Sequence, residues 1–447
     1  MAVEASGPTF SVSVWSFLYG PRSAPVSRER RPVMEGLMPV PVPNRKRILA
    51  SFAIAYVLLA CGLSVTAALP ELRRSVRMSD TVTSLHGSFF GWGLVVGGLF
   101  GSKAIRSLGR LNVLVGSSAA LGVGAVLFGT AHSIAQSLSG GALIGLGAAA
   151  VVITVPGLVA DVFGPERNAI FTQLNIAPGL GGLGFPLLLA IAPSLGLTWR
   201  VPTAALPAAL LVIMAVFVGP LLRTRRSVRT FPAGRRTSDQ TLTTSRDVMM
   251  LLRHRAVRHR FTLQVLAVAV EFSSGAWVVV FLREHGFSRA SAPLGGAAWA
   301  IGLMSSRALT GRLIGWFGKR LEAACFLGGI IGVLMILYGP SSLRLLVVCV
   351  AAFSFGPLYT LGVERLFMNA ESAGIHDTAA VSALAAVASG LAITVGPFVV
   401  GVLADRAGLR TALLLVPVAS MVGVITCLRR WGGEAGMSGQ TPPAMLA

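Results

Sequence analysis

Charged residues are scarce in this chain, and their scarcity excludes most soluble proteins. Only 12% of the 447 residues are Asp, Glu, Lys or Arg, whereas soluble domains carry about 25%. Hydrophobic residues make up 54% of the chain and the mean hydropathy is +0.74, so most of the surface cannot face water. The composition therefore predicts an integral membrane protein.

Cysteine and the common enzymatic motifs are also rare or missing. The four cysteines lie in apolar stretches without the spacing of a metal site or a disulfide framework. The chain has no phosphate-binding loop of the Gly-x4-Gly-Lys-Ser type, no His-Glu-x-x-His and no Gly-x-Ser-x-Gly elbow. We therefore expect no enzymatic activity, no cofactor, no metal and no use of ATP.

Acidic residues are half as frequent as basic ones, 17 against 38, which gives a net charge of +21. In a soluble protein this excess would indicate a nucleic-acid partner. Here the basic residues lie in short segments between apolar runs, as the positive-inside rule produces. The aromatic residues lie in the apolar runs and not among the arginines, so no nucleic-acid partner is expected.

What the sequence does contain is about twelve apolar stretches of some 20 residues, each long enough to span a bilayer as a helix. The predicted spans are 47–69, 84–105, 111–131, 134–160, 170–192, 200–222, 260–283, 290–314, 321–339, 342–364, 378–404 and 409–428. The fold class is thus an all-α membrane protein in contact with lipid, with about twelve transmembrane helices.

Arginine-rich connections fix the expected orientation. Basic residues precede the first span and follow the second, sixth, eighth and twelfth, all on one side if the count is even. Both termini should then be cytoplasmic, in a bacterial inner membrane. The opposite side is poorer in charge but carries Arg73, Arg74, Arg77, Arg283 and Arg289.

The two halves of the chain repeat. An offset of about 209 residues maps the second span onto the eighth, and three pairs carry the match: Gly93 with Gly302, Lys103 with Arg312, and Gly109 with Gly318. Two pseudo-symmetric six-helix bundles follow from this offset. The expected division is a disordered basic cytoplasmic tail (1–44), a first bundle (45–222), a basic cytoplasmic linker (223–257), a second bundle (258–430) and a C-terminal tail (431–447).

The loops after the second and eighth spans carry a recognisable pattern. Residues 311–320 read Gly-Arg-Leu-Ile-Gly-Trp-Phe-Gly-Lys-Arg, which resembles the Gly-x-Leu-x-Asp-Arg-x-Gly-Arg-Arg signature of the major facilitator superfamily. The residues of this pattern are Gly311, Arg312, Gly318 and Lys319 in the second half and Arg106, Gly109 and Arg110 in the first. Gly315 and Arg106 stand where the signature has an acid. A third similar string, residues 401–408, contains Asp405.

The resemblance covers residues 45–430 and implies a secondary transporter that moves a small organic solute by alternating access. Several proton-driven members carry an Arg in the fourth helix where this chain has Gly141. The Gly-Pro signature of drug exporters is degraded at 181–186, and the run from Glu271 to Trp277 is more similar to sugar permeases. An efflux pump exchanging hydrophobic drugs for protons and a non-transporting receptor of the same fold stay as alternatives.

Glu271 is the sharpest candidate for coupling to protons. It lies eleven residues into its span, about 16 Å deep at 1.5 Å per residue, where a carboxylate needs a partner or water. Gln264 and Ser274 share its helical face. This face is predicted to bind substrate or protons; the alternative is a structural hydrogen bond to a neighbouring helix.

Other polar residues within the spans are weaker candidates. His86 is either a proton relay or a hydrated histidine at the helix mouth. Gln173, Asn175 and Tyr359 could contact the substrate or hold helices together equally well. Arg307 is expected to extend toward the cytoplasmic surface, with substrate contact as the alternative.

Acidic and basic residues also gather at the cytoplasmic ends of the fourth and tenth spans. Asp161, with Glu166 and Arg167, closes the fourth span, and Arg365 lies with three acids in the matching region of the second half. These residues are expected to form gating or structural ion pairs.

Overall fold

The computed structural model describes residues 45–163, 166, 170, 174, 176–223, 250–375 and 378–437, and every regular element in these ranges is helical. The predicted tail 1–44 and most of the predicted linker lie outside the described residues. Ten described segments are long and apolar enough to cross a membrane. The all-α membrane fold is thereby confirmed, while the predicted domain bounds stay predictions.

Twelve described helices have sixteen residues or more. The first half of the chain contains α2 (Arg45–Ser64), α4 (Asp80–Leu108), α5 (Arg110–Gly129), α6 (Ile134–Phe163), α8 (Ile176–Ile191) and α9 (Arg200–Arg223). The second half contains α12 (Arg255–Glu284), α13 (Pro293–Phe317), α14 (Leu321–Tyr338), α15 (Arg344–Ser372), α16 (Thr378–Ala407) and α18 (Leu415–Met437).

Two predicted spans are interrupted. The α-helical part of the first ends at Ser64, and a 3-10 turn (η1, Val65–Ala68) leads into the short α3 (Leu69–Val76). The last predicted span is divided into α17 (Leu409–Leu413) and α18. Pro417 explains the second break, because proline has no N–H to donate to the carbonyl four residues earlier, at Leu413.

Glycines let the helices of each half approach closely at equivalent positions. A β-carbon on Gly93 of α4 would lie 2.5 Å from the backbone of Gly145 in α6. In the second half, the Cys349 carbonyl of α15 presses on Gly302 of α13 in the same way. Gly93 and Gly302 are a pair predicted by the repeat, so the internal symmetry of the sequence appears as matching helix crossings.

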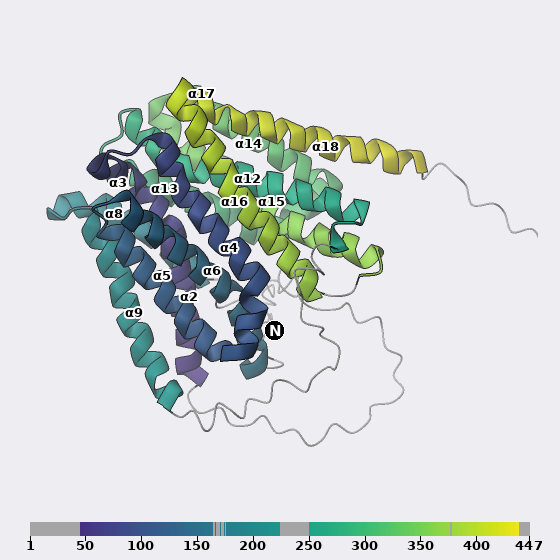
Figure 1. Cartoon of the computed structure of the whole chain (residues 1–447). Helices are drawn as coiled ribbons and strands as arrows, with labels where there is room; N and C mark the ends of the chain where they lie inside the picture. Colours follow the sequence, from purple (N-terminus) through teal and green to yellow (C-terminus); the bar gives the residue numbers. More distant parts are fainter. Residues whose placement is uncertain are drawn as a thin grey trace, which may run out of the picture.

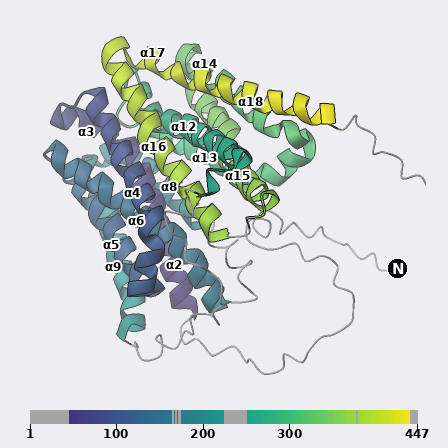
Figure 2. The same cartoon turned by 45° about the vertical axis from the view of Figure 1, so that its right-hand side comes forward.

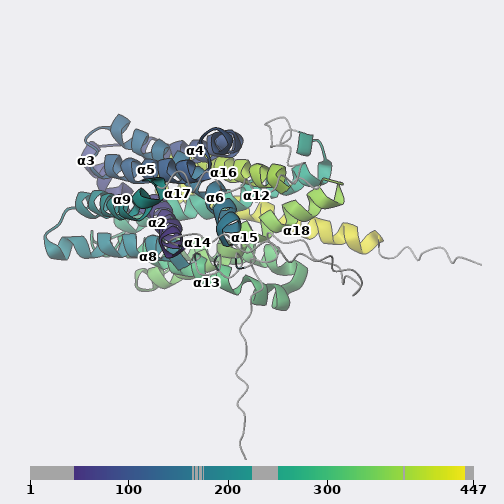
Figure 3. The ribbon, with the colours of Figure 1, turned by 90° about the horizontal axis from the view of Figure 1, so that it is seen from below.

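The two halves meet along two pairs of helices. In Figures 1 and 2, α4 and α16 run side by side, and the Ser88 hydroxyl of α4 donates to the Thr394 carbonyl of α16 at 2.8 Å. Figure 3 shows the same two helices adjacent where the halves meet. In the second pair, α8 and α13, Pro186 lies 3.4 Å from the position of a β-carbon on Gly296.

The halves converge at one end of the molecule, where α3 and α17 lie near the top of Figure 1, and spread toward the other. We call these the α3 end and the Gly109 end. Gly109 and Gly318 each end a long helix with positive φ, 80° and 53°, a backbone conformation that favours glycine. Gly408 repeats this at the α3 end with φ 80°. Glycine in the three related strings is thus required by the backbone at the point where the helix stops.

Candidate functional site

Glu271 and Arg307 form an ion pair inside the second half. Arg307 Nη2 donates to Glu271 Oε1 at 2.7 Å, and Arg307 Nε donates to the Gly356 carbonyl at 3.3 Å. The pair thereby joins α12, α13 and α15. Glu271 Oε2 is buried and has no hydrogen-bond partner among the described residues, which is unusual for a buried carboxylate oxygen.

The expectation that Arg307 extends toward the membrane surface is wrong. Its guanidinium turns to Glu271 instead. The physical reason is that a carboxylate with 4% of its side chain exposed would be costly to bury without a counter-ion. The sequence offered one signal for this ion pair: both residues lie within predicted membrane spans.

Arg307 lies on the face of α13 that meets the other half. Ala300 and Met304 of this helix contact Gly182 and Gly179 of α8. At 3.6 residues per turn, Arg307 follows on the same face, one turn beyond the Met304 contact toward the Gly109 end. Its side chain is 41% exposed, so the guanidinium is the accessible member of the pair and Glu271 is the covered one.

Tyr359 lies beside this pair. Its ring centroid is 5.7 Å from Arg307 Cζ, within the range of a cation–π contact, and the residue is 38% exposed. From the sequence, Tyr359 and Glu271 were two unrelated candidates. The packing of α15 against α12 and α13 brings them together around one arginine.

Gln264 and Ser274 share the helical face of Glu271, as predicted, but this face packs inside the second half. Gln264 is fully buried against Gly362 of α15, and neither amide atom has a hydrogen-bond partner among the described residues. The Ser274 hydroxyl donates to the Val270 carbonyl of its own helix at 2.8 Å. A role in binding stays a prediction for both.

His86 lies apart from this site. Its Nε2 is 2.9 Å from the Ser137 hydroxyl of α6, its Nδ1 is 3.0 Å from the Thr83 carbonyl, and it is 5% exposed. The alternative of a hydrated histidine at the helix mouth is therefore wrong. Both ring nitrogens have partners within the first half, so the structure gives His86 a position that fits the packing of α4 against α6.

The other predicted residues are placed as follows. Gln173 and Asn175 lie outside the described residues, and Asp161 and Arg106 lie in α6 and α4 with side chains that are not described. Arg110 begins α5 and packs over Gly157 of α6. Gly311, Arg312 and Lys319 are exposed near the end of α13.

Three ion pairs bear on the residues predicted at the ends of the fourth and tenth spans, and two of those residues, Arg365 and Glu166, take part in them. Glu322 of α14 is buried and pairs with Arg260 of α12, at 3.2 Å, and with Arg365 of α15. All three residues belong to the second half, so this cluster holds helices of one half together. Arg45 pairs with Glu166 at 3.1 Å, and both side chains are exposed.

Asp405 makes a contact between the halves at the α3 end. Its two carboxylate oxygens accept hydrogen bonds from the backbone N–H groups of Asp80, at 2.7 Å, and Thr81, at 2.8 Å. These groups belong to the first turn of α4, where the helix dipole favours a negative charge. The third signature-like string thus holds the acid that the other two lack, and α16 presents it to the opposite half.

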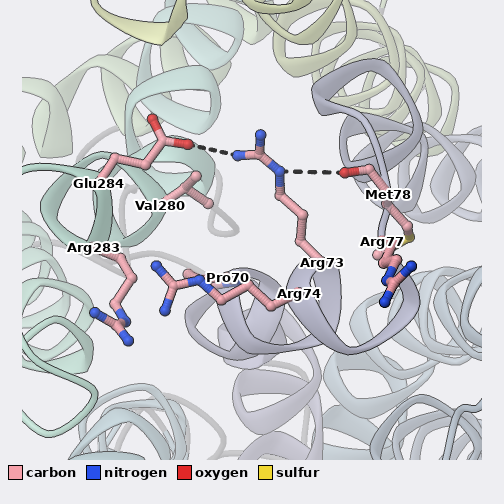
Figure 4. A pocket seen from close by; sticks show the side chains of 8 residues that line it. All are labelled: Pro70, Arg73, Arg74, Arg77, Met78, Val280, Arg283 and Glu284. Atoms are coloured by element: carbon pink, nitrogen blue, oxygen red, sulfur yellow. Dashed lines mark hydrogen bonds and ion pairs between the residues drawn. The ribbon is translucent and has the colours of Figure 1, made fainter.

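Arg73, Arg283 and Glu284, which form ion pairs at the same end, line a pocket of about 330 Å³, and two of these pairs join the halves. Arg73 of α3 pairs with Glu284 of α12 at 2.6 Å and with Asp80 at 2.8 Å, and Arg283 pairs with Glu71 at 3.2 Å. Figure 4 shows Arg73 reaching from α3 to Glu284 across this pocket. In the sequence, these arginines stood out only because they lie on the side of the membrane that the positive-inside rule leaves poor in charge. That position was the available signal for this cluster.

Asp80 lies before the predicted span 84–105 and outside the candidate membrane spans. Burial and the neighbouring carboxylates of Glu284 and Asp405 raise its pKa to about 6, although Arg73 acts in the opposite direction. Arg73 is shared with Glu284, so it compensates Asp80 only in part.

Comparisons with known proteins agree with this architecture. The family model described as Major Facilitator Superfamily matches residues 51–375. The nucleoside transporter NupG superposes with a TM-score of 0.71 at 14% identity, over 86% of this chain and 99% of that one. A bacterial homologue of the human lysosomal transporter Spinster, in an inward-facing and unoccupied conformation, gives 0.67 at 15% identity, over 90% and 99%. At these identities the two structures show a shared fold. No curated sequence matches the chain.

Proposed function

Because the chain belongs to the Major Facilitator Superfamily, whose members are multi-pass transporters of small solutes, we propose that it couples solute movement to a proton gradient through Glu271. The observation that carries this proposal is the Glu271–Arg307 ion pair. It lies at mid-span, on a helix that meets the other half, which is where repeat-built transporters bind their solutes.

Alternating access requires the halves to separate at one end while they close at the other. The ion pairs at the α3 end and the Asp405 contact with α4 support a conformation closed at that end. The Gly109 end carries the arginine-rich loops, so by the positive-inside rule it is cytoplasmic in this proposal. The membrane is then the inner membrane, with both termini in the cytoplasm.

Protonation of Glu271 would change the charge that Arg307 presents between the halves. Burial disfavours a carboxylate charge, and Arg307 is the group that offsets this cost. The groups facing Glu271 are Arg307 from α13 and, beyond it, Tyr359 from α15. Proton binding therefore releases one cation toward the surface where the halves meet, and proton loss recaptures it.

The test is solute-dependent proton movement in vesicles containing the purified protein and an internal pH dye. Sugars, organic acids and cationic drugs form the panel. In Glu271→Gln we expect accumulation driven by the pH gradient to be lost while solute exchange persists. The matched control is Glu322→Gln, which removes another buried, arginine-paired acid and should keep coupling. Unchanged accumulation in Glu271→Gln would refute the proposal, and binding without flux would favour a receptor.

A further inference from the structure

We infer that the solute is an organic anion whose charged group binds Arg307 when Glu271 is protonated. This inference rests on the proposed function and adds the class of solute to it. It follows from the order in which the two charges lie, from the donors that Arg307 keeps and from charge balance.

The order of the charges decides between anion and cation. A solute between the halves meets Arg307 first, because this side chain is 41% exposed and that of Glu271 only 4%. A cationic solute would approach the guanidinium before it could reach the carboxylate, and like charges repel. A transporter of cationic drugs needs the reverse order, with the acid exposed.

The guanidinium keeps donors for a second anion. Its described hydrogen bonds use Nε, toward Gly356, and Nη2, toward Glu271, whereas a guanidinium has five N–H groups in a fork suited to carboxylate or phosphate. Tyr359 lies against Arg307 and limits the directions in which the fork can point. The N–H groups that these hydrogen bonds do not use are the donors that a solute anion would meet.

Charge balance links this anion to the proton. With Glu271 ionised, the pair is neutral; with Glu271 protonated, Arg307 carries a charge that no carboxylate compensates, on a side chain that is 41% exposed between the halves. A bound anion restores neutrality. One proton on the Glu271 carboxylate and one anion on Arg307 then move together with no net charge, and release of both lets the pair re-form.

The charge at Arg307 can be measured without knowing the solute. Met304, 42% exposed and three residues before Arg307, is changed to Cys; Cys349 is changed to Ala, and the other three cysteines are buried. Rates of modification by an anionic and a cationic methanethiosulfonate reagent are then compared. Ile301→Cys is the matched control, since Ile301 is 45% exposed on the same helix but lies about 120° around it from Arg307, against about 60° for Met304.

In the Met304→Cys chain that also carries Glu271→Gln, we expect the anionic reagent to react about tenfold faster relative to the cationic one than at Ile301→Cys. Adding Arg307→Gln should abolish this preference. The last chain has neither charge of the pair, so it should fold. Equal rates, or a preference for the cationic reagent, in the Glu271→Gln chain would overturn the inference.

The solute panel separates this inference from the proposed function. Proton movement with organic acids, lost in Glu271→Gln, supports both. Proton movement with sugars or cationic drugs alone, lost in the same variant, would overturn the anion and leave proton coupling in place. Conversely, an anionic preference at Met304→Cys with unchanged accumulation in Glu271→Gln would overturn the role of Glu271 as proton carrier and leave the anion site.

Discussion

Glu271 and Arg307 are each difficult to bury alone, and each supplies what the other needs. The carboxylate is covered by the second half, whereas the guanidinium keeps contact with the surface between the halves. Such an asymmetric pair responds to the loss of either member in a different way. Removing the arginine strands a buried charge, and neutralising the glutamate leaves a cation that still has access to water.

This asymmetry gives a prediction for stability at neutral pH. Arg307→Met should lower the stability of the fold by about 3 kcal/mol, at the lower end of the range for broken buried pairs because Arg307 is partly exposed. Glu271→Gln should cost less, and the double variant Glu271→Gln/Arg307→Met should recover most of the loss. Thermal unfolding in detergent measures all three. Additive effects in the double variant would contradict an energetic link between the two residues.

At the scale of helices, close contact at glycine sets how α13 crosses α15. Gly302 has the Cys349 carbonyl and Ala352 against it, whereas Gly315, on the same helix, has open space around it. The position of Arg307 beside Glu271 and Gly356 depends on this crossing, because Arg307 lies only five residues from Gly302 on a rigid helix.

We predict that Gly302→Val destabilises the protein by about 1–3 kcal/mol or more through overpacking, whereas Gly315→Val changes stability by under about 1 kcal/mol. Folded yield and unfolding temperature in detergent report on both variants. Both variants replace glycine by valine in the same helix, so an effect of helix propensity alone should appear in both. Equal losses would therefore show that the α13–α15 contact is not the cause.

At the scale of the whole molecule, the α3 end combines four acids and several arginines drawn from both halves. Asp80 has a raised pKa there, about 6 against an ordinary 3.8. Its pKa is raised by burial and by Glu284 and Asp405. Both of these acids belong to the second half, so we expect the shift to shrink when the halves separate at this end. The closed state therefore binds a proton at Asp80 more tightly than an open state in which the carboxyl is hydrated.

Closure at the α3 end should consequently strengthen as the pH falls through 6, by about tenfold in the closed-to-open ratio between pH 7 and pH 5. Spin labels at Leu195→Cys and Leu343→Cys, both exposed at that end, report the distance between the halves. Asp80→Asn mimics the protonated acid, so it should hold the acid-like ratio at both pH values. A closed fraction that falls on acidification would contradict the assignment.

Composition and hydropathy were sufficient for the class of fold, because a bilayer leaves a chain few ways to satisfy its backbone. The repeat offset also predicted the equivalence of Gly93 and Gly302, since symmetric halves place small residues at the same crossings. The sequence also placed Glu271 well inside its helix, and it lies sixteen residues after the start of α12; its depth in the membrane stays a prediction. These inferences need only local pattern and helix geometry.

Which residues meet across helices was decided by the tertiary structure alone. Arg307 was expected at the surface and instead faces Glu271, because helix packing brings α12 and α13 together at that depth. Asp405 lies 325 residues from Asp80 in the chain, and no periodicity predicts that pairing. A sequence fixes the helices through their own composition, whereas pairing between helices depends on rotation and register that only packing sets.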